Sequence, residues 1–288
     1  MTEKHILLKN RLEELYTSYH SSYLYSDPLK YLHLYEKPED REIVGLIASS
    51  LAYGRVERIF VSIEYVLDVI GPNPADYVKD FDPFKDAADF KGFIHRFNRG
   101  EDIASLLWFV RQVIESCGAI GGLFSRIYRE EAGDIKRALS AFTAYILRLD
   151  SSPFYGGGSL PQDAGVRYFF PSPDKGSACK RLNLYLRWMA RPDDGVDLGL
   201  WSFIDPANLI MPIDTHIARL SKNLGLTSLK SPNWKMAEEI TANLKLLDPA
   251  DPLRYDFALC RLGILDICPL KKDNKRCLQC GIKEICLL

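Results

Sequence analysis

Apolar residues recur three or four positions apart along most of the chain, which is the spacing of one face of an α-helix. Residues 81–98 are rich in aromatic side chains and are expected to be partly helical. No run of alternating apolar and polar residues predicts a strand. The pattern therefore predicts an all-α fold, with its clearest helices at 4–24, 39–51, 56–70, 101–116, 135–149, 176–191, 214–224, 232–247 and 252–267.

One helix is predicted to pack unusually close to a neighbour. Within 252–267, Ala258 and Gly263 leave one side with little side-chain bulk. Since two backbones can approach most closely where side chains are small, another helix is expected to lie against that side. The same helix leads directly into Cys268.

The helical pattern stops between residues 150 and 176. Long loops inside compact domains are uncommon and are often functional. The glycine triplet 156–158 lacks the Gly-Lys-Ser/Thr ending of a phosphate-binding loop, which excludes that class. Residues 167–170 either line a pocket or anchor the loop to the core, and the sequence leaves both interpretations open.

Composition indicates a globular protein without a membrane span. The chain has 47% hydrophobic residues, and 37 Lys and Arg balance 38 Asp and Glu for a net charge of −1. No apolar run approaches the roughly 20 residues that cross a bilayer. The first residues lack the basic–apolar pattern of a signal peptide, so a cytoplasmic protein without membrane contact is expected.

The neutral net charge argues against a surface basic throughout, but one local exception stands out. No acidic residue lies between Lys175 and Arg191, whereas Lys180, Arg181 and Arg187 do. Such a segment predicts either a basic face that contacts phosphates or an ordinary solvated helix surface.

The four cysteines at the end of the chain carry the strongest chemical signal. Their spacing is C-x8-C-x2-C-x5-C, and thiolates bind zinc or iron–sulfur clusters in sets of four. One Cys-x-x-Cys pair with unequal outer gaps and no nearby His favours a [4Fe–4S] cluster over zinc. Two disulfides are the remaining alternative, which the expected cytoplasmic location disfavours. The predicted ligands are Cys268, Cys277, Cys280 and Cys286.

Basic residues fill the first gap of this motif. A cluster that rigidifies the segment would let these side chains grip phosphates, which predicts DNA contacts by Lys271, Lys272, Lys275 and Arg276. The three other cysteines, Cys117, Cys179 and Cys260, are interpreted as small buried hydrophobic residues.

Three segments, in order, resemble the helix-hairpin-helix DNA glycosylase superfamily, especially its endonuclease III-like members. Residues 176–186 resemble the end of the hairpin and the following helix, and residues 211–220 resemble the segment with the catalytic Asp. The cysteine motif resembles the family's iron–sulfur loop, and 43–59 more weakly resembles its early helix pair. The hairpin differs in having Ala178 for a glycine. The long interval between the first two segments resembles archaeal 8-oxoguanine DNA glycosylases.

The resemblance implies base-excision repair, with or without AP-lyase activity. Lys180 would be the nucleophile that attacks C1′ of the sugar, and Asp214 the catalytic carboxylate. A lysine with an ordinary pKa of about 10.4 is protonated at neutral pH. A first-turn position and the charge of Arg181 both disfavour the ammonium form. Asp214 is equally suited to be a plain helix N-cap.

The resemblance also implies a two-lobed fold: 36–203 would form a helical lobe containing Lys180, and 1–35 with 204–288 a second lobe containing Asp214 and the cysteines. Because the target base must leave the duplex, an aromatic pocket is expected, and its candidates are Tyr168, Phe169, Trp188 and Trp201. Further predicted DNA contacts are Tyr53 as a wedge, with Arg55, Lys175, Arg181 and Arg187.

The expected partner is damaged duplex DNA, bound by a monomer. The competing hypothesis is a protein that keeps the glycosylase fold and metal cluster but binds nucleic acid without excising a base. It predicts salt-sensitive binding that survives substitution of Asp214.

Overall fold

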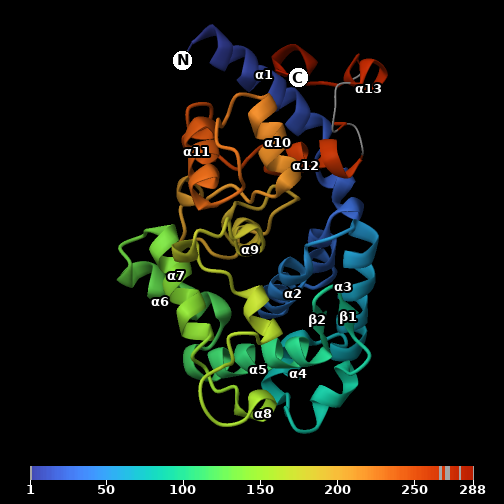
Figure 1. The fold of residues 1–288 in the computed structure, drawn as a ribbon, viewed down its shortest axis with the longest axis vertical. Coiled ribbons are helices and arrows are strands. Elements are labelled where there is room, and N and C mark those ends of the chain that lie inside the picture. The colour runs from blue at the N-terminus through green and yellow to red at the C-terminus, as the bar shows by residue number, and fades with distance from the viewer. Residues whose placement is uncertain (1, 266–267, 270–272, 279, 288) are drawn as a thin grey trace. The chain divides into compact units, whose positions relative to one another are not determined.

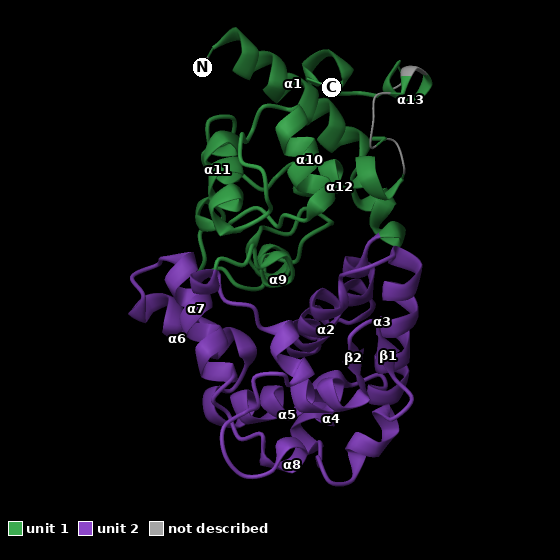
Figure 2. Cartoon of the chain, in the orientation of Figure 1, with its two compact units in different colours: residues 1–26, 176–288 green, residues 27–175 purple. Residues whose placement is uncertain are grey.

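The computed structural model describes residues 2–265, 268–269, 273–278 and 280–287. The chain forms two compact units, one of residues 1–26 and 176–288 and the other of residues 27–175 (Figure 2). The described residues are predominantly helical (Figure 1), which confirms the all-α prediction at that level.

The unit boundaries differ from the predicted 36–203 and 1–35 plus 204–288. Residues 27–35 belong to the middle unit, and residues 176–203 belong to the unit formed by the two ends of the chain. Lys180 and Asp214 therefore share one unit instead of lying in two.

The middle unit is a set of helices and short 3-10 turns. Its α-helices are α2 (Pro38–Leu51), α3 (Val56–Ile70), α4 (Pro74–Asp80), α5 (Gly100–Cys117), α6 (Ile120–Glu130), α7 (Ile135–Ile146) and α8 (Ser152–Tyr155). Its 3-10 turns are η2 (Pro28–Leu34), η3 (Asp86–Phe90), η4 (Gly165–Phe169) and η5 (Pro173–Lys175). Four of the helices, α2, α3, α5 and α7, lie close to their predicted ranges.

Two short strands interrupt the helices where 81–98 was expected to be partly helical. Strands β1 (Ile94–His95) and β2 (Asn98–Arg99) pair antiparallel, with His95 opposite Asn98. Both inner residues are buried and hydrogen bonded: His95 contacts Ser62 Oγ, and Asn98 donates to Asp102 and to the carbonyl of Gly165. These contacts to distant residues fix a hairpin that is too short to show an alternating pattern.

The other unit combines both ends of the chain. Its elements are α1 (Glu3–Ser18), η1 (Ser21–Ser26), α9 (Lys180–Ala190), η6 (Pro206–Asn208), α10 (Thr215–Asn223), α11 (Trp234–Lys245), α12 (Asp256–Ile264), α13 (Asn274–Leu278) and η7 (Lys283–Ile285). The first helix packs against the last part of the chain through α12 and η7. Tyr255 donates a hydrogen bond of 2.7 Å to Glu13, which links α1 to the start of α12.

Two helices begin later than predicted, and the reason is competition for the capping side chain. Asn233 caps α11 by accepting from the amide of Met236, so this helix does not start at Pro232. Asp251, which directly precedes the predicted start at residue 252, does not cap a helix there, because its carboxylate binds Arg191 at 2.7 Å. The helix consequently starts at Asp256 and ends at Ile264.

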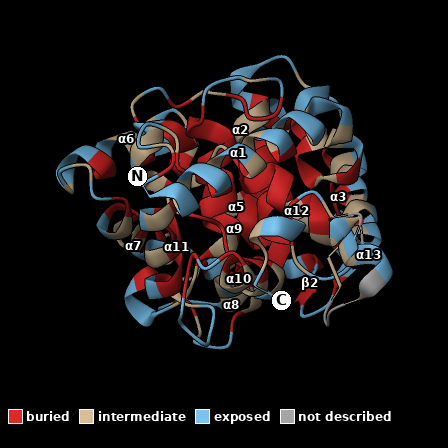
Figure 3. Cartoon of the chain, turned by 90° about the horizontal axis from the view of Figure 1, so that it is seen from above, coloured by how far each residue is buried: buried red, intermediate tan, exposed pale blue. Residues whose placement is uncertain are grey.

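Helix α9 forms the buried centre of its unit, since every residue from Arg181 to Ala190 is buried (Figure 3). Its last carbonyls, which have no partner within the helix, accept hydrogen bonds from a later segment. The amide of Leu198 donates to Trp188 O at 2.9 Å, and that of Trp201 donates to Met189 O at 2.7 Å.

Arg187 in α9 and Arg191, the residue that follows the helix, are neutralised by acidic residues from later in the chain. Arg187 binds Asp197, at 3.1 Å, and Asp256. Arg191 binds Asp197, and also Asp194 at 3.2 Å and Asp251 at 2.7 Å. Charges buried in this way are tolerated only when they are paired. These ion pairs therefore hold residues 194–197, Asp251 and Asp256 against the last turn of α9.

No single helix in the described ranges combines the length and the apolar character needed to cross a membrane. Helices α5 and α6 meet both criteria only when they are joined, across a bend of 68°.

Replacing Asp197 with Ala should destabilise the protein strongly, because both Arg187 and Arg191 lose a buried partner. We expect the free energy of unfolding to fall by about 3–5 kcal/mol, measured by urea denaturation. The matched control is Asp76→Ala, which removes an exposed pair with Lys79 of 3.9 Å and should cost less than about 1 kcal/mol. Equal effects of the two substitutions would contradict the buried network.

Candidate active site

Lys180 and Asp214 meet in the structure, as the resemblance implied for a catalytic pair. Nζ of Lys180 lies 3.0 Å from Oδ2 of Asp214. Their side chains are 29% and 36% exposed, so solvent reaches the pair without surrounding it. Both belong to the same unit, and their separation is therefore set by the packing within it.

The turn before α9 places Lys180. Cys179 adopts the left-handed conformation (φ 47°), which is strained for a residue with a side chain. Its amide donates to Ser177 Oγ, and the side chain of Asn183 donates to Ala178 O at 3.1 Å. Lys180 is consequently the first residue of the helix, which begins at 180 and not at the predicted 176. Its predicted first-turn position is confirmed.

Asp214 uses its two carboxylate oxygens for different purposes. Oδ1 accepts from the amides of His216 and Ile217, each at 2.9 Å, and so caps α10. Oδ2 faces Lys180. The N-cap interpretation is thus confirmed, and it leaves one oxygen available for chemistry.

The carboxyl group of Asp214 is held in its ionised form. Burial alone would raise its pKa, but the charge of Lys180 and the amide of Ile217 outweigh burial and lower the pKa below its ordinary value. At neutral pH the group is therefore a carboxylate that stabilises positive charge beside it.

An arginine that the sequence analysis did not single out joins this site to the cysteine segment. Arg219 donates to Nδ1 of His216 at 2.9 Å, and to the carbonyls of Cys268, at 3.2 Å, and Pro269. Burial lowers the pKa of His216, and Arg219 and Lys180 act in the same direction against Asp214, which favours the neutral ring. The sequence signal that could have identified Arg219 is its position within residues 211–220, which resemble the segment with the catalytic Asp.

The predicted close approach of two helices is confirmed at His216. Helices α10 and α12 are in contact, and a Cβ at Gly263 would lie 2.1 Å from Nε2 of His216. Only glycine leaves room for the ring at this position.

The four cysteines of the motif are half-buried free thiols. Burial raises the pKa of Cys268, and the other three cysteines raise it further, so each of them lies within electrostatic range of Cys268. Among the described residues, no group of three or more His, Cys, Asp or Glu side chains is arranged to hold a metal ion. The metal site remains a prediction that rests on the donor set.

The other cysteines differ in burial. Cys179 is buried, and burial raises its pKa to about 12, as expected for an inert thiol. Cys117 and Cys260 are only half-buried.

The basic face predicted on 175–191 is largely absent from the surface. Arg187 is 2% exposed and ion-paired, and Arg181 is 8% exposed. The carboxylate partners of Arg187 are Asp197 and Asp256, which the segment itself could not reveal. Neither side chain is placed to contact DNA. Lys175 and Arg55 are exposed, as are Lys275 and Arg276 on α13; Lys271 and Lys272 lie outside the described residues.

Three of the four residues predicted to line a base pocket are buried. Phe169, Trp188 and Trp201 are 2% exposed or less and belong to the cores of their units, with the tryptophans in one unit and Phe169 in the other. Tyr168 is 41% exposed, and its ring contacts Tyr53 at 5.0 Å between centroids.

Tyr53 is a fixed support and not an exposed wedge. Its hydroxyl is 2.6 Å from Asn98 Oδ1 and 2.9 Å from His95 O, so it holds the hairpin. The exposed residues are at the hairpin turn, where Phe97 is 66% exposed and Arg96 has φ 53°. Sequence analysis missed both because it did not predict the strands.

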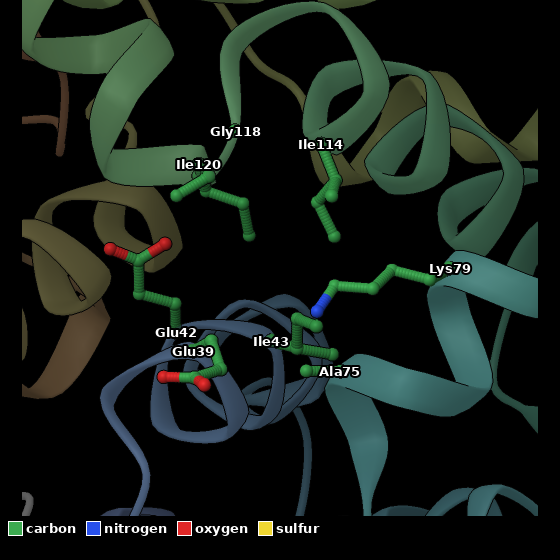
Figure 4. A pocket seen from close by; sticks show the side chains of 9 residues that line it. Glu39, Glu42, Ile43, Ala75, Lys79, Ile114, Gly118 and Ile120 are labelled. Atoms are coloured by element: carbon green, nitrogen blue, oxygen red, sulfur yellow. The ribbon is translucent and has the colours of Figure 1, made fainter.

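A hollow of about 290 Å³ lies between α2, α4 and the ends of α5 and α6 (Figure 4). Glu42 and Lys79 line it together with Ile43, Ile114 and Ile120. Glu42 accepts a hydrogen bond of 3.1 Å from the amide of Gly121. This contact caps α6, which gives the carboxylate a structural role.

Comparison with known protein families assigns the chain to one of them. The profile of the family described as "Protein of unknown function (DUF2400)" matches residues 27–265, and the chain belongs to this family. No curated protein and no solved structure matches the chain.

Substitutions of Asp214 should separate its cap from its charge. Asp214→Ala removes the cap and should lower the free energy of unfolding by about 1–2 kcal/mol. Asp214→Asn keeps a good capping side chain and should cost less, which urea denaturation measures. A larger loss in the Asn variant than in the Ala variant would contradict the cap.

The same pair should respond to pH. Because the folded pKa of Asp214 is lowered, its stabilisation is present above the unfolded pKa, about 4, and is lost as the pH falls through the folded value. The stability difference between the wild type and Asp214→Asn should therefore be constant near pH 7 and shrink below about pH 4.

Proposed function

We propose that this protein is a DNA glycosylase that excises a damaged base, with Lys180 as nucleophile and Asp214 as catalytic carboxylate. The observation that carries the proposal is the 3.0 Å contact between Lys180 Nζ and Asp214 Oδ2. Two segments that resemble the glycosylase superfamily, 176–186 and 211–220, supply its two partners. Both side chains are partly exposed, as the approach of a sugar requires.

The chemistry of the pair suits cleavage of an N-glycosidic bond. As the base departs, C1′ of the sugar becomes cationic, and the carboxylate of Asp214 stabilises that charge. The departing base carries the electron pair of the broken bond and needs a proton. Lys180, held as an ammonium by Asp214, donates that proton and becomes a neutral amine.

The neutral amine then has an electrophile beside it. Its nitrogen attacks C1′ and forms a C–N bond, the ring C1′–O4′ bond opens, and O4′ takes up a proton from the amine. The product is an iminium adduct between Lys180 and the sugar. This adduct is the starting point of AP-lyase cleavage, and borohydride reduces it to a stable amine.

We further propose that the four cysteines hold a [4Fe–4S] cluster. The fit rests on four thiols, three of them within electrostatic range of Cys268, and on the absence of a histidine from residues 268–286. When bound, the cluster supplies a rigid fold for the segment. Arg219, through Cys268 O and Pro269 O, then ties that segment to the helix that begins after Asp214.

DNA contacts are assigned to the basic residues that remain exposed: Lys175, Arg55, Lys275 and Arg276. Phe97 is the best exposed aromatic residue of the hairpin and is suited to stack on bases.

The same ion pair also suits the competing hypothesis of a protein that binds nucleic acid without excision. A paired ammonium is not a nucleophile until it loses its proton. The two functions differ in whether any base is released, and the trapping experiment below separates them.

Borohydride trapping on duplexes that carry single damaged bases tests the enzyme. The wild type should form a covalent adduct on at least one lesion, and Lys180→Ala should form none. Asp214→Asn should slow base release by about 10²–10⁴-fold. The matched control is Lys235→Ala, because Lys235 lies in the first turn of α11 and is exposed.

An adduct that persists in Lys180→Ala would remove the assignment of the nucleophile. Salt-sensitive binding of DNA with no base release on any lesion would favour the binding protein.

Anaerobic purification tests the cluster. The protein should be brown and contain about four irons per chain, and Cys280→Ser should lose iron. Cys117→Ser is the control, because Cys117 lies outside the motif and should leave the iron content unchanged. A colourless protein with one bound zinc would establish the alternative metal.

A further inference from the structure

We propose that the hollow beside α7 in the middle unit binds an anionic ligand of mononucleotide size with a flat ring. The hollow measures about 850 Å³, which is within the usual range for small-molecule sites, about 300–1,000 Å³. It lies between the second half of α7 and residues 158–175 of the long loop. This site does not include Lys180 or Asp214, although it shares Lys175 with the proposed DNA contacts.

Hydrogen bonds from Arg167 to the loop backbone hold one wall of the hollow in place. Arg167 donates from Nη2 to Leu160 O at 2.6 Å and from Nε to Pro161 O at 2.5 Å. Leu160 and Phe170 are 4% and 2% exposed, so the loop is anchored on both sides of the opening. The sequence alternatives for 167–170 are thereby both realised, since Arg167 and Phe170 line a pocket while Phe169 is an anchor.

The charge of the lining favours an anion. Its ionisable residues are Arg148, Arg167, Lys175 and Asp174, which sum to 3 − 1 = +2. Arg148 and Lys175 are exposed at the rim. Neither forms an ion pair with another described residue, so both charges are available to a ligand.

The remaining lining supplies the other two features of the ligand. Leu147 and Pro171 give the lining an apolar part suited to a flat ring, backed by the buried side chains of Leu160 and Phe170. Ser140, Ser159 and Gln162 offer hydroxyl and amide groups to the edge of a heterocycle or to phosphate oxygens. A nucleoside monophosphate combines the ring, the polar edge and the negative charge.

Isothermal titration calorimetry of the full-length protein with AMP at low salt tests the proposal. AMP should bind, and both adenosine and inorganic phosphate should bind at least tenfold more weakly, because each lacks one half of the recognition. The double variant Arg148→Gln/Lys175→Gln should weaken AMP binding at least tenfold. Ser159→Asp, which adds a negative charge at an exposed rim position, should weaken it in the same direction.

The matched control is Arg129→Gln. Arg129 is an exposed arginine near the end of α6 whose Nε donates to the carbonyl four residues earlier, as Arg148 does just after the end of α7. Arg129 does not line the hollow, and its variant should bind AMP like the wild type. No AMP binding at 1 mM, an unchanged affinity in the double variant, or inorganic phosphate bound as tightly as AMP would each overturn the proposal.

Discussion

The placement of α9 depends on its buried arginines. A helix with Arg187 and Arg191 turned inward is unstable alone, because each charge loses its hydration. Asp197, Asp251 and Asp256 restore the balance, and they can do so only when residues 191–256 fold back onto the helix. The need to pair these charges thus orders the following chain around α9, the helix that carries Lys180 as its first residue.

The strained turn before α9 and the cap of α10 complete that arrangement. Cys179 holds a left-handed conformation that begins the helix at Lys180, and two amides hold one oxygen of Asp214. A single residue therefore serves as structural cap and as a charge aimed at the lysine. Because the two oxygens of one carboxylate can have different partners, a cap signal in a sequence cannot by itself exclude a catalytic role.

The middle unit shows how far local patterns extend. The helix predicted at 56–70 has those bounds in the structure, because its apolar stripe faces one core and Gly71 ends it. The hairpin at 94–99 was missed, since its two-residue strands are fixed by His95 and Asn98 through partners at residues 53, 62, 102 and 165. Hydrogen bonds over such separations leave no periodic trace.

The sequence by itself determined the helical class, most helix positions, the cysteine set and the two residues of the candidate pair. The first three follow from spacing along the chain, which is a local property, whereas the pair came from the resemblance of residues 176–186 and 211–220 to the glycosylase superfamily. Tertiary structure decided which charges are buried, because Arg187 resembles a surface residue until Asp256, far along the chain, reaches it. It also decided that the predicted aromatic residues Trp188 and Trp201 are core, since burial is a property of the packed unit and not of any single segment.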